Sequence, residues 1–360
     1  MRIGIITQPL LSNYGGILQN YALQQVLIRM GHKPITIDLL PPQRRKDKIK
    51  HYLRSFLHLK WPDKWDSPNR RNRNIHRFIS KNLKTTHLVR KYNGTIVKLY
   101  RFDTIIAGSD QIWRPMYNEY YADHLYDEYF KFVGSSPVGK IVYAASFGTD
   151  EWEYSQEQTE TCRSLIHKTN AVSVREKSGV ELCRQYFGIE AQWVLDPTLL
   201  LDAEDYERLC AHILRAEQSF IAAYLLDVEE ELTDRIKALA LEFELPLRFF
   251  STGEIKTLSI EEWLAMFRDA TYVITDSFHG TVFSIIFNRP FISIGNSSRG
   301  MSRFLSLLEQ FGLEDRLSPE ISTEIMLRPI SWDSINERKD AWKEKSMRFL
   351  EQNLDVFRQK

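Results

Sequence analysis

The feature that most constrains this chain is an alternation of short apolar runs, polar turns and stretches of helical length. Residues 2–7 form a largely apolar run, a polar turn with two glycines follows, and a helical stretch at 17–30 ends before Gly31. Further apolar runs occur at 35–40, 104–107 and 140–145. Because parallel strands need a crossover connection that is usually a helix, this alternation predicts an α/β protein with a parallel sheet.

The same pattern starts again near residue 171. The expected strands of this second series lie at 171–174, 192–195, 220–225, 247–250, 272–275 and 291–294. A chain of 360 residues is also too long for one ordinary core. We therefore expect two Rossmann-like domains facing across a cleft, at 1–168 and 169–335. By analogy with such folds, we expect the amphipathic segment 336–360 to pack back on the first domain.

Charge and cysteine content exclude several classes of protein. The formal net charge of +1 argues against a globally basic nucleic-acid binder. Three cysteines without CxxC spacing indicate neither a disulfide framework nor a thiolate zinc site, which fits a reducing cytoplasm. No apolar stretch approaches eighteen residues, and neither HExxH nor GxGxxG occurs. We expect a cytoplasmic protein without a metal or a resident cofactor, and its oligomeric state stays open.

Residues 44–77 form a basic insertion with twelve Lys or Arg and three Asp. Within it Ile49, Tyr52, Leu53, Phe56 and Leu57 have the spacing of one helical face, which predicts a basic amphipathic helix. Such a helix can lie on the inner face of the cytoplasmic membrane, or it can pack on the core with its charged side in water. The pattern leaves both alternatives open.

Two polar segments each follow an expected strand of the first domain, where open α/β sheets bind ligands. The first contains Asn13, Tyr14, Gly15, Gly16 and Gln19, and its alternative interpretation is a tight turn that packs helix on strand. The second contains Asp110, Gln111 and Trp113. Asp110 and Gln111 could bind sugar hydroxyls, Asp110 could take a proton from an attacking hydroxyl, and Trp113 could serve as a platform for a sugar ring. A helix cap and a buried indole are the alternatives.

Two segments in the second half contain arginines that are candidates for binding an anion. Arg175 follows the expected strand 171–174 and could bind a carboxylate or phosphate, or form an ion pair with Glu176 or Asp196. Arg299 and Arg303 lie in a polar loop after the last expected strand and could close over an anionic ligand.

The most informative segment is a strand that turns polar and enters an apolar helix at 274–283. His279 lies near the start of that helix, where backbone N–H groups and the helix dipole attract anions. Ser277, Gly280 and Thr281 surround it and could add donors. We expect His279 to supply a proton and these neighbours to bind a phosphate or carboxylate group.

The ordered segments NYGGILQNYALQ, AGSDQIW, VSVREKSG, VLDPTLLL and TDSFHGTVFSIIFNRPF resemble the polysaccharide pyruvyl transferase family. The resemblance covers most of residues 1–315. It implies a GT-B-like pair of domains, phosphoenolpyruvate as donor, and a saccharide or lipid-linked saccharide as acceptor that gains a pyruvate ketal. On this resemblance we expect His279 and Asp110 to be the catalytic residues, and we assign acceptor binding to Asn13, Tyr14, Gly15, Gly16, Gln19, Gln111 and Trp113. Active members carry an Arg-Leu-His run in the last motif. Here His279 matches, whereas Phe278 and Ser277 replace the leucine and the arginine.

Two other functions fit the same segments. One is a GT-B glycosyltransferase with a nucleotide-sugar donor, since the start of a helix binds diphosphate as readily as phosphoenolpyruvate. The other is a glycan-binding protein that has lost turnover together with the arginine at position 277.

Overall fold

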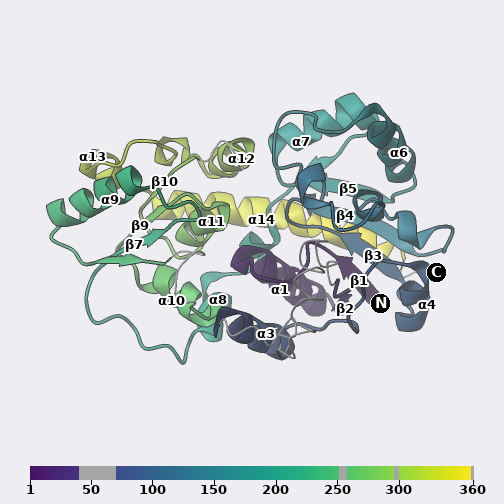
Figure 1. Cartoon of the computed structure of the whole chain (residues 1–360), viewed down its shortest axis with the longest axis horizontal. Coiled ribbons are helices and arrows are strands. Elements are labelled where there is room, and N and C mark those ends of the chain that lie inside the picture. The colour runs from purple at the N-terminus through teal and green to yellow at the C-terminus, as the bar shows by residue number, and fades with distance from the viewer. Residues whose placement is uncertain (40–69, 251–257, 296–299, 358–360) are drawn as a thin grey trace, which may run out of the picture.

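The computed structural model describes residues 1–39, 70–250, 258–295 and 300–357 (Figure 1). It contains two sheets in which all neighbouring strands are parallel. The first has the order β2-β1-β3-β4-β5-β6, with β1 Arg2–Ile6, β2 Lys33–Thr36, β3 Thr104–Ala107, β4 Gly139–Ala145, β5 Ala171–Val174 and β6 Gln192–Trp193. The second has the order β10-β9-β7-β8, with β7 Ile221–Tyr224, β8 Leu247–Phe249, β9 Tyr272–Thr275 and β10 Phe291–Ser293.

Helices connect the strands, as the alternation of the sequence predicts. Those of the first half are α1 Tyr14–Arg29, α3 Arg70–Asn82, α4 Gly94–Tyr100, α5 His124–Asp127, α6 Gln156–Ile166 and α7 Lys177–Leu182. Those of the second half are α8 Ala203–Leu209, α9 Glu230–Glu242, α10 Ile260–Asp269, α11 Phe278–Ile286, α12 Ser302–Phe311, α13 Thr323–Leu327 and α14 Trp332–Asp355. The fold class, two Rossmann-like α/β domains of the GT-B type, is confirmed.

The boundary expected near residue 168 is wrong. β5 pairs with β4 and β6 pairs with β5, so residues 171–193 complete the first sheet. The change of sheet falls between β6 and β7. An apolar run in the sequence indicates that a strand forms, but it does not indicate which sheet the strand joins. Here β5 pairs with the free edge of β4.

The two halves share one apolar core. A single cluster of buried side chains includes Ile5 of β1, Leu23 of α1, Val273 of β9 and Phe283 of α11. Helix α1 lies at the junction and is buried on most of its surface, including the polar side chains of Gln19, Asn20 and Gln24. The short 3-10 helix η4, Pro197–Leu200, packs against α1 and leads from the first sheet into the second half.

Helix α14 runs along both halves (Figure 1). At the first sheet its Phe349 contacts Tyr143 of β4, with ring centroids 6.1 Å apart, and its Ser346 Oγ accepts a hydrogen bond from the backbone N–H of Leu195 at 2.9 Å. At the second half it packs on α12. Its 24 residues are amphipathic, and no helix in the described ranges is both long and apolar enough to cross a bilayer.

Most of the basic insertion lies outside the described residues. Residues 44–69 fall there, including the five apolar positions of the expected amphipathic helix. The remainder forms part of α3, in which Ile75 and Phe78 are buried in the core. Contact of residues 44–77 with a membrane stays a prediction.

Replacing Phe349 with alanine tests whether α14 stabilises the first sheet. Truncating this buried ring removes its contact with Tyr143, and we expect the free energy of unfolding to fall by about 3–5 kcal/mol in chemical denaturation. The matched control is Glu351→Ala on an exposed position of the same helix, expected to change stability by less than about 0.5 kcal/mol. Equal effects of the two substitutions would mean that α14 does not anchor the fold through Phe349.

Candidate functional site

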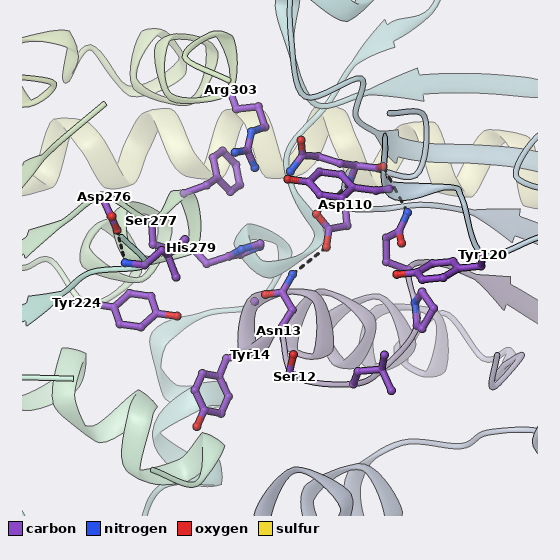
Figure 2. A pocket seen from close by; sticks show the side chains of 18 residues that line it. Ser12, Asn13, Tyr14, Asp110, Tyr120, Tyr224, Asp276, Ser277, His279 and Arg303 are labelled. Carbon is purple, nitrogen blue, oxygen red and sulfur yellow. Dashed lines mark hydrogen bonds between the residues drawn. The ribbon is translucent and has the colours of Figure 1, made fainter. Parts of the chain in front are cut away.

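A cavity of about 500 Å³ lies between the two halves (Figure 2). Its walls come from segments that follow β1, β3, β7 and β9, at the carboxyl ends of both sheets, where open α/β sheets bind ligands. The lining residues are Gln8, Pro9, Leu11, Ser12, Asn13, Tyr14, Gly15, Asp110, Gln111, Tyr117, Tyr120, Tyr224, Leu226, Asp276, Ser277, Phe278, His279 and Arg303.

Asn13 and Asp110 form the polar centre of the first-half wall. Asn13 Nδ2 donates a hydrogen bond to Asp110 Oδ2 at 3.0 Å, and the backbone N–H of Gln111 donates to Asp110 Oδ1 at 2.9 Å. Asp110 has a φ of 69°, a left-handed conformation that aspartate tolerates better than most residues. These contacts hold one carboxylate in a fixed orientation at the cavity.

His279 projects from the first turn of α11 toward this wall (Figure 2). Ser277 caps the helix, because its hydroxyl accepts a hydrogen bond from the N–H of Gly280 at 3.4 Å. The side chain of His279 is only 9% exposed. Burial lowers its pKa to about 4, and the nearby guanidinium groups of Arg175 and Arg303 act in the same direction against Asp196 and Asp110. His279 is therefore neutral near pH 7.

Gly15 allows the two halves to meet at this point. A Cβ atom at residue 15 would overlap the imidazole of His279, so only glycine fits here between α1 and α11. Tyr14 joins the halves beside it, since its hydroxyl donates a hydrogen bond to the carbonyl of Leu258 and its ring lies 5.8 Å from that of Trp263.

Arg175 lies behind the cavity in a buried cluster of charges. Its Nη1 lies 2.8 Å from Asp196 Oδ2, its Nε 3.3 Å from Glu176 Oε1, and its Nη2 3.7 Å from Asp110 Oδ1. Burial opposes the charge of the guanidinium, but the three carboxylates outweigh burial and raise its pKa. Arg175 thus forms ion pairs with both Glu176 and Asp196, which was the alternative to ligand binding. It does not line the cavity.

Arg303 is a cation that does line the cavity. It comes from α12, and its guanidinium carbon lies 5.6 Å from the ring centroid of Phe278. Burial, together with the positive charge of Arg175, lowers the pKa of Arg303 to about 10, so its side chain is still charged near pH 7.

Several residues assigned to the site from sequence do not line the cavity. Trp113 is 0% exposed and stacks on Tyr129 with ring centroids 4.8 Å apart, so it belongs to the core and its role as a sugar platform is wrong. Thr281 uses its hydroxyl on Ser277 O and Ser293 Oγ inside the protein. Gly16, Gln19 and Gly280 are also not among the lining residues. Arg299 falls outside the described residues.

The structure adds residues that sequence analysis missed. Tyr117 and Tyr120 follow the AGSDQIW motif and supply the aromatic side chains that Trp113 does not, while Tyr224 ends β7. Asp276 accepts hydrogen bonds from the N–H groups of Leu226 and Asp227 at 2.7 and 2.9 Å. No spacing pattern in the sequence distinguishes these tyrosines as site residues. Asp276, in contrast, lies in the polar part of segment 274–283, which the sequence does indicate as a site. Across the described ranges, no three His, Cys, Asp or Glu side chains are placed to hold a metal ion.

Two parallel sheets with a polar cavity at the carboxyl ends of their strands define a two-domain α/β protein, and its cavity lies where open α/β sheets usually bind ligands. A sequence model of the polysaccharide pyruvyl transferase family matches residues 13–298, which include all five motifs. The chain belongs to the polysaccharide pyruvyl transferase family, and the resemblance drawn from the motifs is confirmed. The family indicates a transferase of polysaccharide biosynthesis.

Solved structures of sugar-nucleotide proteins are distantly similar to this chain. The UDP-GlcNAc 2-epimerase of Methanocaldococcus jannaschii in complex with UDP-GlcNAc and UDP has 12% identity and a TM-score of 0.41, over 81% of this chain and 83% of its own. That of Neisseria meningitidis, bound to UDP-GlcNAc, has 8% identity and a TM-score of 0.47, over 98% and 99%. The E. coli heptosyltransferase WaaC with ADP has 11% identity and a TM-score of 0.40, over 88% and 100%. A search of curated proteins by sequence finds no match.

Replacing Gly15 with alanine tests the close approach of α1 and α11. The added methyl group must displace the imidazole of His279, and we expect a loss of about 1–3 kcal/mol in unfolding free energy. In the His279→Ala background the same substitution should cost clearly less, because the ring is gone. Chemical denaturation of the two single variants and the double variant measures this coupling, and strictly additive losses would show that the two residues do not contact.

The lowered pKa of His279 predicts a dependence of stability on pH. Between pH 6.5 and 4 the unfolded chain binds a proton on this imidazole that the folded protein excludes, so the residue's contribution destabilises the fold progressively as the pH falls through this window. His279→Gln removes that contribution. As the pH falls, the free energy of unfolding of this variant should therefore decrease less than that of the wild type, and the difference between the two decreases should be at most about 3 kcal/mol. Denaturant titrations at pH 7, 5.5 and 4.5 test this, and parallel pH dependences would contradict a buried neutral imidazole.

Proposed function

We propose that this protein transfers a pyruvyl group from phosphoenolpyruvate to a saccharide and forms a pyruvate ketal, in the synthesis of an extracellular or capsular polysaccharide or another cell-surface glycan. The observation that carries the proposal is the position of His279. The imidazole lines a cavity between the halves, at the start of a helix, with Arg303 and Asp110 on other walls of the same cavity. Membership of the pyruvyl transferase family supports the same donor.

Arg303 and the first turn of α11 are the anion-binding elements in this proposal. Phosphoenolpyruvate carries about three negative charges near neutral pH. Ser277 stands where active relatives have an arginine, and its hydroxyl is committed to capping α11. Arg303 reaches the cavity from α12 beside Phe278. We assign to Arg303 the positive charge that an arginine at position 277 would supply.

His279 is the proposed acid. A bound trianion next to the ring favours the imidazolium, so donor binding raises the pKa of His279 and the site takes up a proton. The imidazolium then donates this proton to the methylene carbon of phosphoenolpyruvate. That carbon becomes a methyl group, and the adjacent carbon becomes an oxocarbenium-like electrophile.

Two hydroxyl groups of one sugar then complete the ketal. The first attacks the electrophilic carbon and gives its proton to Asp110, whose carboxylate is oriented by Asn13. The second attacks the same carbon, the bond to phosphate breaks, and inorganic phosphate leaves with the second proton. Tyr117 and Tyr120 line the first-half side of the cavity, and we assign their rings to packing against the acceptor sugar.

A phosphate-release assay tests this function. Protein, phosphoenolpyruvate and a panel of saccharides and lipid-linked saccharides are mixed, and free phosphate and ketal formation are measured. We expect His279→Gln to lower kcat about 100-fold or more, because it removes the acid. Arg303→Gln should raise KM for phosphoenolpyruvate about tenfold or more, with a smaller effect of Arg303→Lys, because lysine keeps the charge.

Unfolding midpoints of each variant serve as the control for lost stability.

The other two candidate functions give different outcomes. Thermal stabilisation by UDP-sugars and not by phosphoenolpyruvate would replace this proposal with a nucleotide-sugar glycosyltransferase. Stabilisation by phosphoenolpyruvate and a saccharide with no phosphate release would indicate a binding protein. Unchanged turnover in a well-folded His279→Gln protein would remove the proposed acid.

A further inference from the structure

Asp196 connects the buried charge cluster to His279. It is the N-cap of η4, and its Oδ1 accepts hydrogen bonds from the backbone N–H and the hydroxyl of Thr198, at 3.0 and 2.6 Å. Its Oδ2 accepts hydrogen bonds from Arg175 Nη1, at 2.8 Å, and from Gln19 Nε2. Both oxygens are therefore fixed by donors, and the side chain is 1% exposed. Such a carboxylate has a defined direction and no freedom to rotate.

The imidazole of His279 presents one nitrogen to this carboxylate. His279 Nε2 lies 3.9 Å from Asp196 Oδ2. Within the described part of the chain, Nε2 is buried and makes no hydrogen bond. A buried polar nitrogen without a hydrogen-bond partner costs free energy, and folded proteins contain few such atoms. The other nitrogen, Nδ1, lies beside Gly15, which lines the cavity.

We infer that Asp196 is a positioning residue that holds His279 as the Nε2–H tautomer and leaves Nδ1 to exchange the proton with the bound donor. A carboxylate next to Nε2 favours a proton on that nitrogen, because an N–H group interacts favourably with the negative charge whereas a lone pair does not. The distance of 3.9 Å exceeds a hydrogen bond. We expect it to shorten when His279 becomes an imidazolium. The catalytic part of this inference rests on the proposed acid role of His279.

Asp196 also fits the electrostatics of the ring. Four charged groups face His279 from the elements around it, namely Asp196 from η4, Arg175 after β5, Asp110 after β3 and Arg303 from α12. The two arginines oppose an imidazolium, and the two aspartates favour it. Burial raises the pKa of Asp196 itself, but the charge of His279 when its ring is protonated, the guanidinium of Arg175 and the hydrogen bonds from Thr198 outweigh burial and lower this pKa below its usual value. A neutral side chain at position 196 therefore shifts the balance against protonation of His279.

The tautomer can be measured without any turnover. Protein with ¹⁵N-labelled histidine is studied by NMR at pH 7, and the His279 signals are assigned by their loss in His279→Gln. We expect chemical shifts of the Nε2–H form in the wild type and a loss of that preference in Asp196→Asn. An Nδ1–H form in the wild type, or an unchanged spectrum in Asp196→Asn, overturns the inference.

Two further variants keep this test decisive if Asp196→Asn does not fold. Thr198→Val removes one of the hydrogen bonds that orient Asp196 and should shift the His279 signals part of the way toward those expected for Asp196→Asn. Asp269→Asn is the matched control, because the side chain of Asp269 is only 6% exposed and is likewise paired with arginines, Arg268 and Arg215, outside the site. It should lower stability and leave the His279 signals unchanged. Unshifted signals in Thr198→Val, or equal shifts in the control, count against a specific role of Asp196.

Kinetics then separate this inference from the proposed function. In the phosphate-release assay, we expect Asp196→Asn to lower kcat at least tenfold with KM for phosphoenolpyruvate within about threefold, and to move the alkaline limb of kcat to lower pH. A merely structural role would leave the position of that limb unchanged. If wild-type protein releases no phosphate with any acceptor, the proposed function fails, whereas the NMR result still decides whether Asp196 sets the tautomer.

Discussion

The site depends on a close approach of two helices that begin in different halves of the protein. His279 at the start of α11 lies against Gly15 at the start of α1, where no side chain fits. This contact brings the end of β9 next to the ends of β1 and β3 and encloses the cavity. Each half alone supplies only part of the polar groups, since Asp110 and Asn13 belong to one half and His279 and Arg303 to the other.

The buried charge cluster beneath the cavity shows how the protein keeps charges out of water. Arg175 is surrounded by Asp110, Glu176 and Asp196, and the Glu176 carboxylate also accepts a hydrogen bond from Ser146. Desolvating such groups is expensive, and their mutual pairing offsets that cost only when the geometry is good. The cluster therefore fixes the positions of these side chains more than it contributes to net stability, which suits a site that needs oriented groups.

Much of this arrangement follows from the sequence, because strand ends are marked by a change from apolar to polar residues. That change located Asp110 and His279, and in a parallel sheet such ends meet at one edge. Sequence could not show that β5 joins the first sheet, since pairing depends on which edge is free. Nor could it distinguish the buried Trp113 from the lining Tyr117, because both are aromatic residues of one segment and only packing separates them.

The path of α14 limits how the protein moves. This helix packs on β4 at one end and on α12 at the other, and an apolar cluster continues through both halves. A wide hinge opening would expose that cluster to water at about 25 cal/mol for each Å². Ligand entry is therefore expected to use small sliding displacements of packed helices, with the two lobes staying joined.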